Sequence, residues 1–426
     1  MFHTEIVRYV RDRLPRLRLY VTSTGALTLG LGAQFIAFVV LARHLGTDQF
    51  GKLQTISAVT DLAAAVCGFG AGDTMIRRVV RDQSLYPTVL GHSLILILST
   101  GTALTALATA GLAVFINSAD PLQHLGAIAI LAFSNIVLFK WIGLTEQTFL
   151  ARRNFLAANI VNTGFAVFRS IVAIAACLLF KVDTVWNWAL WYGALHLFGS
   201  TACVLAVRRY GAPQWTLIPD EVRRGLYLIT PFFFNVLRQN VDLLAIGMIS
   251  TPATVGRYGA ASRIVTMSLV TVHSFNRLVY PKLALMGRQG TSATFRLAVR
   301  YVVPATFLAL TTSACIFILA PYAPMLFGAE YGEMVVYLRL LCWIPVLVAI
   351  QNAIYDALGA ADRHGLRAAV YNSGCVAGSI LIICLTMFFG LSGTITGIYI
   401  AQGSIAAALW LAGFVARDSA KRSQLV

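Results

Sequence analysis

A stripe of polar and charged side chains lies within one long apolar segment, residues 231–250, and has the chemistry to bind a ligand inside a membrane. Its members occupy positions i, i+3, i+4 and i+7 and therefore share one helical face: Asn235, Arg238, Gln239 and Asp242. A charge at the centre of a bilayer costs ~2.5–3.5 kcal/mol on insertion scales. Such a face avoids lipid, so it either locks two helices together through an Arg238–Asp242 pair or lines a water-filled cavity.

Other apolar segments repeat this pattern, and several of their polar faces carry arginine. Arginine binds phosphate through a planar fork of donors and stays charged at any relevant pH. Taken singly, each basic residue is equally well explained as half of an ion pair or as a side chain that extends to the membrane surface. Taken together, they predict a cationic cavity that binds an anionic substrate, formed by Lys140, Arg169, Asn235, Arg238, Gln239, Arg263, Arg277 and Arg339.

Three acidic residues also lie within apolar segments, and we expect them to couple or gate transport: Asp61, Glu146 and Asp242. A carboxylate at membrane depth can exchange protons, so coupling to a proton gradient is open. Asp242 has Arg238 one turn away, which favours its ionised form. Asp61 has no basic residue within a turn and is the better candidate for protonation.

The composition is that of a polytopic membrane protein. Of its 426 residues, 58% are hydrophobic and only 12% are charged, against about 25% charged in soluble domains. The net charge of +16 does not indicate nucleic-acid binding, because the basic residues lie in short loops between apolar segments. The seven cysteines have no metal-binding spacing, and no P-loop, hydrolase, zinc-protease or dinucleotide motif occurs. We therefore expect no catalytic residue, metal or cofactor, and no enzyme.

Twelve apolar segments are long enough to cross a ~30 Å hydrocarbon core. With the N-terminus inside, 23 basic residues fall in cytoplasmic segments, and four fall outside: Arg43, Lys52, Lys181 and Arg257. This bias predicts cytoplasmic N- and C-termini. The expected parts are a basic segment 1–21 beside anionic lipid, an N-lobe 22–207 with six helices, a linker 208–225, a C-lobe 226–416 with six helices, and a tail 417–426.

A weak internal repeat relates the two halves at an offset near 205 residues. Phe50–Leu53 (FGKL) aligns with Val255–Tyr258 (VGRY), each in the loop between the first and second helix of its half. An even number of spans in each half gives both the same orientation. The predicted fold is therefore all-α, with twelve transmembrane helices in two parallel six-helix lobes and a site between them.

The first hairpin resembles the polysaccharide transporter family, the Wzx-type lipid-linked oligosaccharide flippases. These belong to the MOP superfamily, which also holds MATE drug exporters and the lipid II flippase. The family's loop pattern Ala-Arg-x-Leu-Gly-Pro-x-x-Phe-Gly is matched here except at Thr47, which replaces the usual proline. The matching residues are Ala42, Arg43, Leu45, Gly46, Phe50 and Gly51, followed by Gly70 and Arg77; in the second half they are Pro231, Asp242, Gly256, Tyr258, Ala261 and Pro281.

This resemblance implies a MATE-like fold and a flippase that moves undecaprenyl-pyrophosphate-linked oligosaccharides across the inner membrane by alternating access. Its product would serve O-antigen, capsule or exopolysaccharide synthesis. The expected partners are the lipid-linked oligosaccharide and membrane lipids, with a polysaccharide polymerase and glycosyltransferases as further candidates and no nucleic acid. Two alternatives stay open: a MATE-like small-molecule/proton antiporter and a membrane-embedded glycan polymerase.

Overall fold

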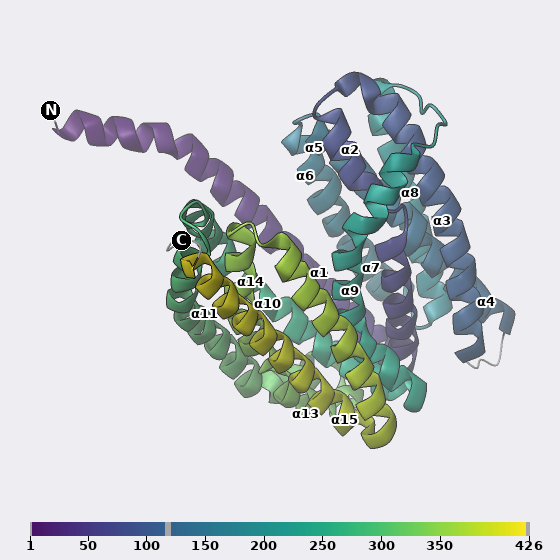
Figure 1. Cartoon of the computed structure of the whole chain (residues 1–426). Helices are drawn as coiled ribbons and strands as arrows, with labels where there is room; N and C mark the ends of the chain where they lie inside the picture. The colour runs from purple at the N-terminus through teal and green to yellow at the C-terminus, as the bar shows by residue number, and fades with distance from the viewer. Residues whose placement is uncertain (1, 116–120, 423–426) are drawn as a thin grey trace.

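The computed structural model describes the backbone of residues 2–115 and 121–422 and the side chains of residues 30–114 and 122–417. Every regular element in these ranges is helical. The helices form two groups that meet at one end and diverge toward the other (Figure 1). The predicted basic segment 1–21 and nearly all of the tail 417–426 lie outside the described side chains.

The helices of the first group cover the N-terminal half. They are α1 (Phe2–Val66), α2 (Ala71–Val79), α3 (Tyr86–Phe115), α4 (Pro121–Phe133), α5 (Phe139–Ala151), α6 (Phe155–Asn159), α7 (Phe165–Phe180) and α8 (Val185–Val207). Two π-helical turns interrupt otherwise continuous helices. Ser134–Leu138 joins α4 to α5, and Ile160–Gly164 joins α6 to α7.

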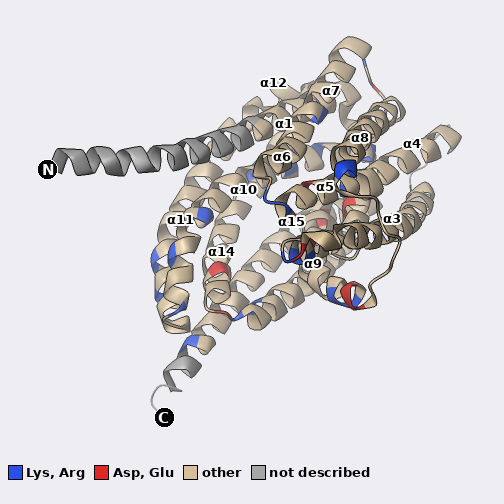
Figure 2. Ribbon diagram, turned by 90° about the horizontal axis from the view of Figure 1, so that it is seen from above, with Lys and Arg blue, Asp and Glu red and all other residues tan. Residues whose placement is uncertain are grey.

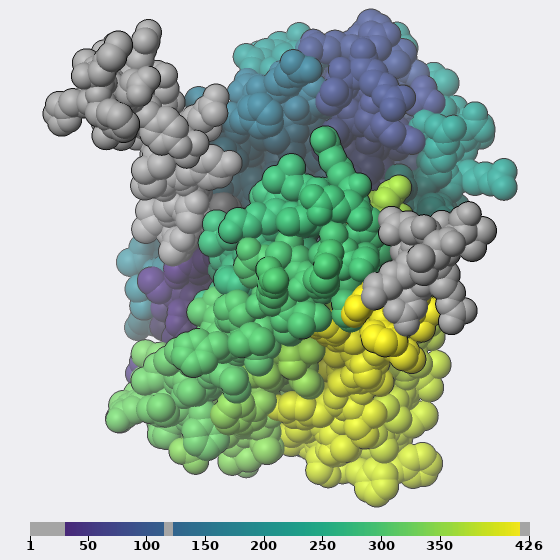
Figure 3. All heavy atoms as spheres, turned by 60° about the vertical axis from the view of Figure 1, so that its left-hand side comes forward, coloured from purple at the N-terminus to yellow at the C-terminus, as the bar shows by residue number. Residues whose placement is uncertain are grey.

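The second group contains the remaining helices. They are α9 (Pro219–Ile249), α10 (Pro252–Gly287), α11 (Thr291–Leu319), α12 (Ala323–Phe327), α13 (Met334–Leu341), α14 (Ile344–Ala360) and α15 (His364–Arg422). The two groups occupy different sides of the surface, purple to teal for the first and green to yellow for the second (Figure 3).

Among the described residues, nine helices are long and apolar enough to cross a membrane. Two of these contain a bend at a glycine with positive φ: Gly46 has φ 68° and ψ 174°, and Gly390 has φ 63° and ψ −142°. Glycine adopts such angles without a Cβ clash, so each bend separates two helices. With α10, which has 36 residues but is too polar to be counted by composition, the described chain contains the twelve predicted spans. Charged residues are sparse among these helices (Figure 2).

The two groups touch at a pair of glycines that the sequence repeat made equivalent. A Cβ atom on Gly51 would overlap the carbonyl oxygen of Pro252, and a Cβ atom on Gly256 would overlap the carbonyl oxygen of Thr47. Residues 47 and 51 correspond to residues 252 and 256 under the offset of 205, so the Gly51–Pro252 contact and the Gly256–Thr47 contact are equivalent. The contact is therefore reciprocal, as across a two-fold axis, and it places the axis of the parallel repeat between α1 and α10.

Side chains around the glycine pair seal this end, which we call the closed end (residues 42–51, 252–257 and 327–333). The Tyr331 hydroxyl donates a hydrogen bond of 2.9 Å to the carbonyl oxygen of Ala42. The Phe50 ring packs edge-on against Tyr331, with ring centroids 6.4 Å apart. Arg257 binds the Glu333 carboxylate at 2.8 Å. The contact between the two groups thus combines close backbone approach with aromatic packing, and the Arg257–Glu333 ion pair lies beside it within the second group.

At the opposite end, helix α9 begins on the first group although most of its length belongs to the second. Glu221 is only 1% exposed, and its carboxylate is bound by Arg77 and by Arg78, the latter at 2.8 Å. Gly225 lies directly against the backbone of Phe69, where a Cβ would overlap the carbonyl oxygen. The helix therefore starts at Pro219, inside the predicted linker 208–225, of which only residues 211–218 lack helical structure.

Candidate functional site

A cavity of about 310 Å³ lies between the two groups of helices, and we call it the central cavity. Its walls come from both halves of α1, from the π-helical turn after α4, from α7 and α8, and from α9 and α10 across the interface. The polar side chains that line it are Gln34, Gln54, Ser57, Thr60, Asp61, Asn135, Arg169, Ser170, Tyr192, Gln239, Asn240, Asp242, Ser262, Arg263 and Thr266.

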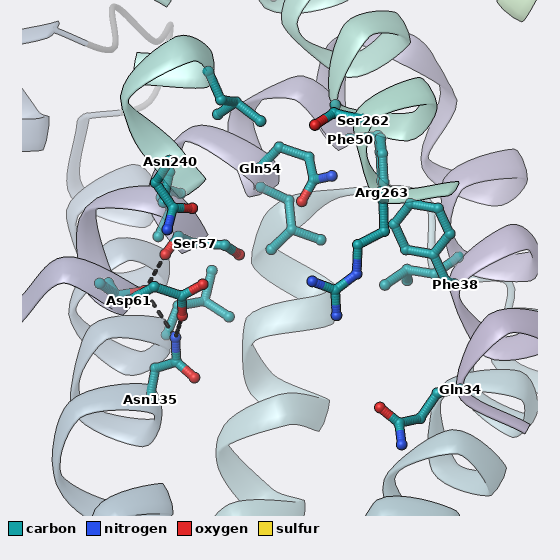
Figure 4. Close-up of a pocket in the computed structure, with 18 of the residues that line it drawn as sticks. Gln34, Phe38, Phe50, Gln54, Ser57, Asp61, Asn135, Asn240, Ser262 and Arg263 are labelled. Carbon is teal, nitrogen blue, oxygen red and sulfur yellow. Dashed lines mark hydrogen bonds between the residues drawn. The ribbon is translucent and has the colours of Figure 1, made fainter. Parts of the chain in front are cut away.

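Asp61 is held in the central cavity by neutral hydrogen-bond donors. The Asn135 amide donates to the Asp61 carboxylate at 3.0 Å and to the Thr60 hydroxyl at 2.9 Å. The Tyr192 hydroxyl donates to the Asn135 carbonyl oxygen at 3.1 Å, which fixes the orientation of that amide. Asn135 lies in the π-helical turn Ser134–Leu138, and such turns frequently occur at functional sites. The network leaves one side of the carboxylate facing the cavity (Figure 4).

Two arginines share the central cavity with Asp61. Arg263 extends from α10 into the open space, away from its own helix (Figure 4). Arg169 contacts the Gln34 amide oxygen at 3.5 Å and lies over the Phe139 ring at 5.9 Å. Both positive charges act on the Asp61 carboxylate, but within the described residues no ion pair joins it to either guanidinium. Apart from the Arg169 donor that contacts Gln34, their donors are therefore available to a ligand that enters the cavity.

A second cavity, of about 610 Å³, extends from the first into the second group of helices; we call it the side cavity. The two cavities share four lining residues: Gln239, Asp242, Ser262 and Thr266. Together they contain three arginines (Arg169, Arg238, Arg263) against two aspartates (Asp61, Asp242), an excess of one positive charge.

The stripe on α9 lines these cavities, but its charged members do not pair with each other. Arg238 donates to the Asn235 amide oxygen at 3.3 Å, and the Tyr371 hydroxyl donates to the same oxygen at 2.9 Å. Asp242 is buried and accepts a hydrogen bond of 2.5 Å from the Tyr258 hydroxyl. The structure thus does not contain the Arg238–Asp242 pair that the sequence left open, because Arg238 binds Asn235 on its own helix and Asp242 is bound by Tyr258 on α10.

Asp61 does not have the isolated environment that its sequence neighbours suggested. The sequence shows no basic residue within one helical turn, yet the fold brings Arg169 and Arg263 from other helices to the same cavity. Helical spacing reports neighbours on one helix only, so it could not detect this arrangement.

Four of the predicted site residues do not line either cavity, and the structure places each of them elsewhere. Lys140 donates to the carbonyl oxygen of Ala64 at 3.1 Å. Glu146 accepts from the Asn162 amide at 2.8 Å. The Arg339 guanidinium lies over the Phe317 ring at 5.1 Å. The fourth residue, Arg277, is exposed near the end of α10.

The cavities also contain polar residues that the sequence analysis did not select. Each is an uncharged amide or hydroxyl side chain inside an apolar span, and some, such as Gln34 and Asn135, have no second polar residue at helical spacing to mark them. A search for lone uncharged polar residues within spans would have found most of them: Gln34, Asn135, Tyr192 and Asn240 in the central cavity, and Gln351, Asn352, Tyr371 and Gln402 in the side cavity.

In the described part of the chain, no group of three or more His, Cys, Asp or Glu side chains could hold a metal ion. Apart from Asp61, Asp242 and His273, the polar groups in the cavities are mainly guanidinium, amide and hydroxyl groups. These groups bind polar and anionic ligands by hydrogen bonds and are not those that transition metals prefer.

Comparison with known sequences assigns the chain to a family. Residues 20–286 match the polysaccharide biosynthesis protein family, and this match covers more than half of the chain. The chain belongs to this family. The family resemblance noted in the sequence is thus confirmed. No curated protein sequence matches the chain.

Solved transporter structures share the fold of this family member. An inward-facing multidrug resistance MATE transporter of the MOP superfamily has a TM-score of 0.73 at 15% identity, covering 92% of this chain and 96% of that chain. The lipid II flippase MurJ, in an inward closed conformation, has a TM-score of 0.71 at 12% identity, covering 93% and 87%. An outward-facing MATE transporter scores 0.60 at 17% identity, covering 93% and 96%. The chain is therefore a multi-pass membrane protein with the MOP transporter fold, arranged more like the inward-facing relative.

Proposed function

We propose that this protein is a flippase that moves undecaprenyl-pyrophosphate-linked oligosaccharide units across the bacterial inner membrane. One observation carries the proposal. The guanidinium groups of Arg169 and Arg263 reach one cavity between the two lobes, and no carboxylate among the described side chains pairs directly with either of them. In a low-dielectric site, free guanidinium donors bind pyrophosphate oxygens through short charge-assisted hydrogen bonds.

The proposed transport cycle follows from the closed end. With N- and C-termini in the cytoplasm, as the loop charges predict, the closed end faces outward and the cavities are reached from the cytoplasm. The pyrophosphate enters there, and the lobes (residues 22–207 and 226–416) rock about the Gly51–Gly256 contact to open the outer side. Asp61 lies beside both arginines, so its negative charge competes with the bound anion and assists its release. Asp242 would take part in coupling from its buried position between the cavities. In polysaccharide synthesis, the flippase would act together with glycosyltransferases and a polysaccharide polymerase.

The proposal is tested by removing one cavity arginine at a time. Arg263→Ala and Arg169→Ala each remove hydrogen bonds to a charged ligand, worth about 1.5–3 kcal/mol, so flipping should fall roughly tenfold to a hundredfold. Lipid-linked glycan reaching the outer leaflet is measured in proteoliposomes with an impermeant glycan-modifying reagent. Arg339→Ala is the matched control, because Arg339 lies outside both cavities over Phe317. Normal flipping by both cavity variants, at equal amounts of inserted protein, would reject the proposal.

A second candidate function, a MATE-like small-molecule antiporter, is favoured by the likeness to MATE structures. It requires an acidic cavity for organic cations, whereas the joined cavities hold one more arginine than aspartates. Uptake of a fluorescent organic cation into the same proteoliposomes distinguishes the two functions. A glycan polymerase is less well supported, since the family and its structural neighbours are transporters and flippases. In the described residues, moreover, the longest stretch without a helix is 211–218.

A further inference from the structure

The side cavity contains buried amide groups whose oxygens find no partner in the described part of the chain. Gln351 on α14 and Gln402 on α15 are 3% and 4% exposed. The amide oxygen of each has no hydrogen-bond partner among the described residues, although both side chains line the cavity. Most buried polar side-chain atoms in proteins are hydrogen-bonded. The missing donors must therefore come from whatever occupies the cavity.

Opposite chemistry is present on another wall of the same cavity. The Arg238 guanidinium donates one bond to Asn235, but its Nε is buried without a partner. Two tyrosine rings, Tyr355 and Tyr371, lie with their centroids 5.1 Å apart at an angle of 58°. Both contribute to the cavity lining. An occupant would thus meet unfilled acceptors, an unfilled donor and aromatic surface.

Aliphatic side chains complete the lining and limit what the occupant can be. Leu341, Ile344, Val348, Ile382 and Ile398 supply apolar surface between the polar groups. A prenyl chain would fill this surface but would leave the amide oxygens without donors. A pyrophosphate offers only acceptors near neutral pH and would repel the same oxygens. A sugar ring satisfies all of these groups, because its hydroxyls both donate and accept and its ring presents an apolar face.

We propose that the side cavity is a carbohydrate subsite that holds a hydroxyl- or acylamide-bearing sugar ring of the transported glycan. The inference rests on the proposed flippase function and deepens it. The side cavity has a volume of about 610 Å³, within the range of about 300–1,000 Å³ typical of small-molecule sites. It joins the central cavity at Gln239 and Asp242. A pyrophosphate at Arg263 therefore places the attached sugar toward Gln351 and Gln402.

Soluble probes test this subsite without the lipid-linked substrate. Detergent-solubilised full-length protein is titrated with N-acetylglucosamine, with inorganic pyrophosphate and with farnesol, and binding is followed by saturation-transfer NMR. Gln351→Leu/Gln402→Leu removes both acceptors at nearly constant volume. The expected result is that the sugar binds the unmodified protein and binds the double variant about tenfold more weakly. Gln289→Leu is the matched control, because Gln289 is exposed in the turn after α10 and lines neither cavity.

The three probes separate the possible outcomes. Pyrophosphate binding should be unchanged in the double variant, which also shows that the variant is folded. If the unmodified protein does not bind the sugar, or if the double variant binds it equally well, the subsite is refuted whether or not pyrophosphate binds. If the double substitution strengthens farnesol binding and the sugar does not bind, the cavity is a lipid site and the carbohydrate proposal is also overturned. Loss of flipping in Arg263→Ala is measured separately, so the flippase function can fail or stand independently of the subsite.

Discussion

The reciprocal glycine contact predicts that a single methyl group will open the closed end. Gly51→Ala places a Cβ against the carbonyl oxygen of Pro252. This oxygen belongs to the backbone and cannot rotate away, so the two helices must separate. Gly143→Ala is the matched control, because Gly143 also lies within a helix but a Cβ there meets nothing within 4 Å.

The magnitude follows from the clash alone. Replacing a helical glycine by alanine gains about 0.8–1 kcal/mol of helix stability relative to the unfolded chain, but the helix is formed in both the closed and the open state, so this gain cancels between them. Overpacking a close contact costs about 1–3 kcal/mol. At the lower end of this range, about 1 kcal/mol, Gly51→Ala increases the fraction that is open roughly fivefold.

Cysteine labelling measures this fraction. Thr47 is 6% exposed beside the glycine pair, so Thr47→Cys should react slowly with a membrane-impermeant maleimide. Adding Gly51→Ala should speed the reaction about fivefold, and adding Gly143→Ala should not. Gly256→Ala should match Gly51→Ala, and the double variant should show less than the sum, because separation of the helices removes both clashes at once. Unchanged labelling in Gly51→Ala, or effects of Gly51 and Gly256 that simply add, would refute a shared reciprocal contact.

Three further predictions concern other parts of the structure. Glu221→Gln should lower the stability of the detergent-solubilised protein by about 1–3 kcal/mol in a thermal melt, since it weakens charged hydrogen bonds to Arg78. The control Asp220→Asn, at an exposed residue one position earlier, should have little effect. Equal losses in the two variants would contradict a stabilising role for the Glu221–Arg78 contact. Asp61→Asn should tighten pyrophosphate binding roughly fivefold, because about 1 kcal/mol of repulsion is lost, and it should slow flipping. Weaker pyrophosphate binding, measured by calorimetry, would contradict the proposed role of Asp61 in release. Gly46→Ala should destabilise the first hairpin by about 1–2 kcal/mol, because its φ of 68° combined with its ψ of 174° suits only glycine. An unchanged melting temperature would count against the bend.

Much of the architecture was accessible from the sequence because membrane topology is governed by local rules. Span length, loop charge and the position of Gly46 each depend on a short stretch of chain. The match between Phe50–Leu53 and Val255–Tyr258 was also local and predicted only the repeat, whereas the structure shows that its glycines are the point where the lobes touch. Glycine is required at both Gly51 and Gly256 because each backbone packs on the other helix. The two glycines in the repeat are therefore a consequence of this contact.

The arrangement of charges was accessible only in part, because it depends on which helices meet. Periodicity correctly grouped the residues of one face, including Arg238 and its partner Asn235, but it could not supply the partner of Asp242, which is Tyr258 on another helix. Lys140 shows the limit clearly: its position within a span suggested a cavity, whereas it donates to the carbonyl oxygen of Ala64. Asn135 shows the converse, a single amide that gains its place beside Asp61 through a π-helical turn.

The two-fold framework and the charged site have different symmetry, and this difference bears on mechanism. The offset of 205 residues pairs Asp61 with Thr266 and Arg263 with Ala58, so neither charge has a charged counterpart on the equivalent helix. A symmetric contact at Gly51 and Gly256 lets the lobes rock with similar packing in each direction. An asymmetric set of charges gives the ligand only one favourable orientation between them. The repeat can thus supply the motion, while the later divergence of the two halves supplies the polarity with which a lipid-linked anion is held.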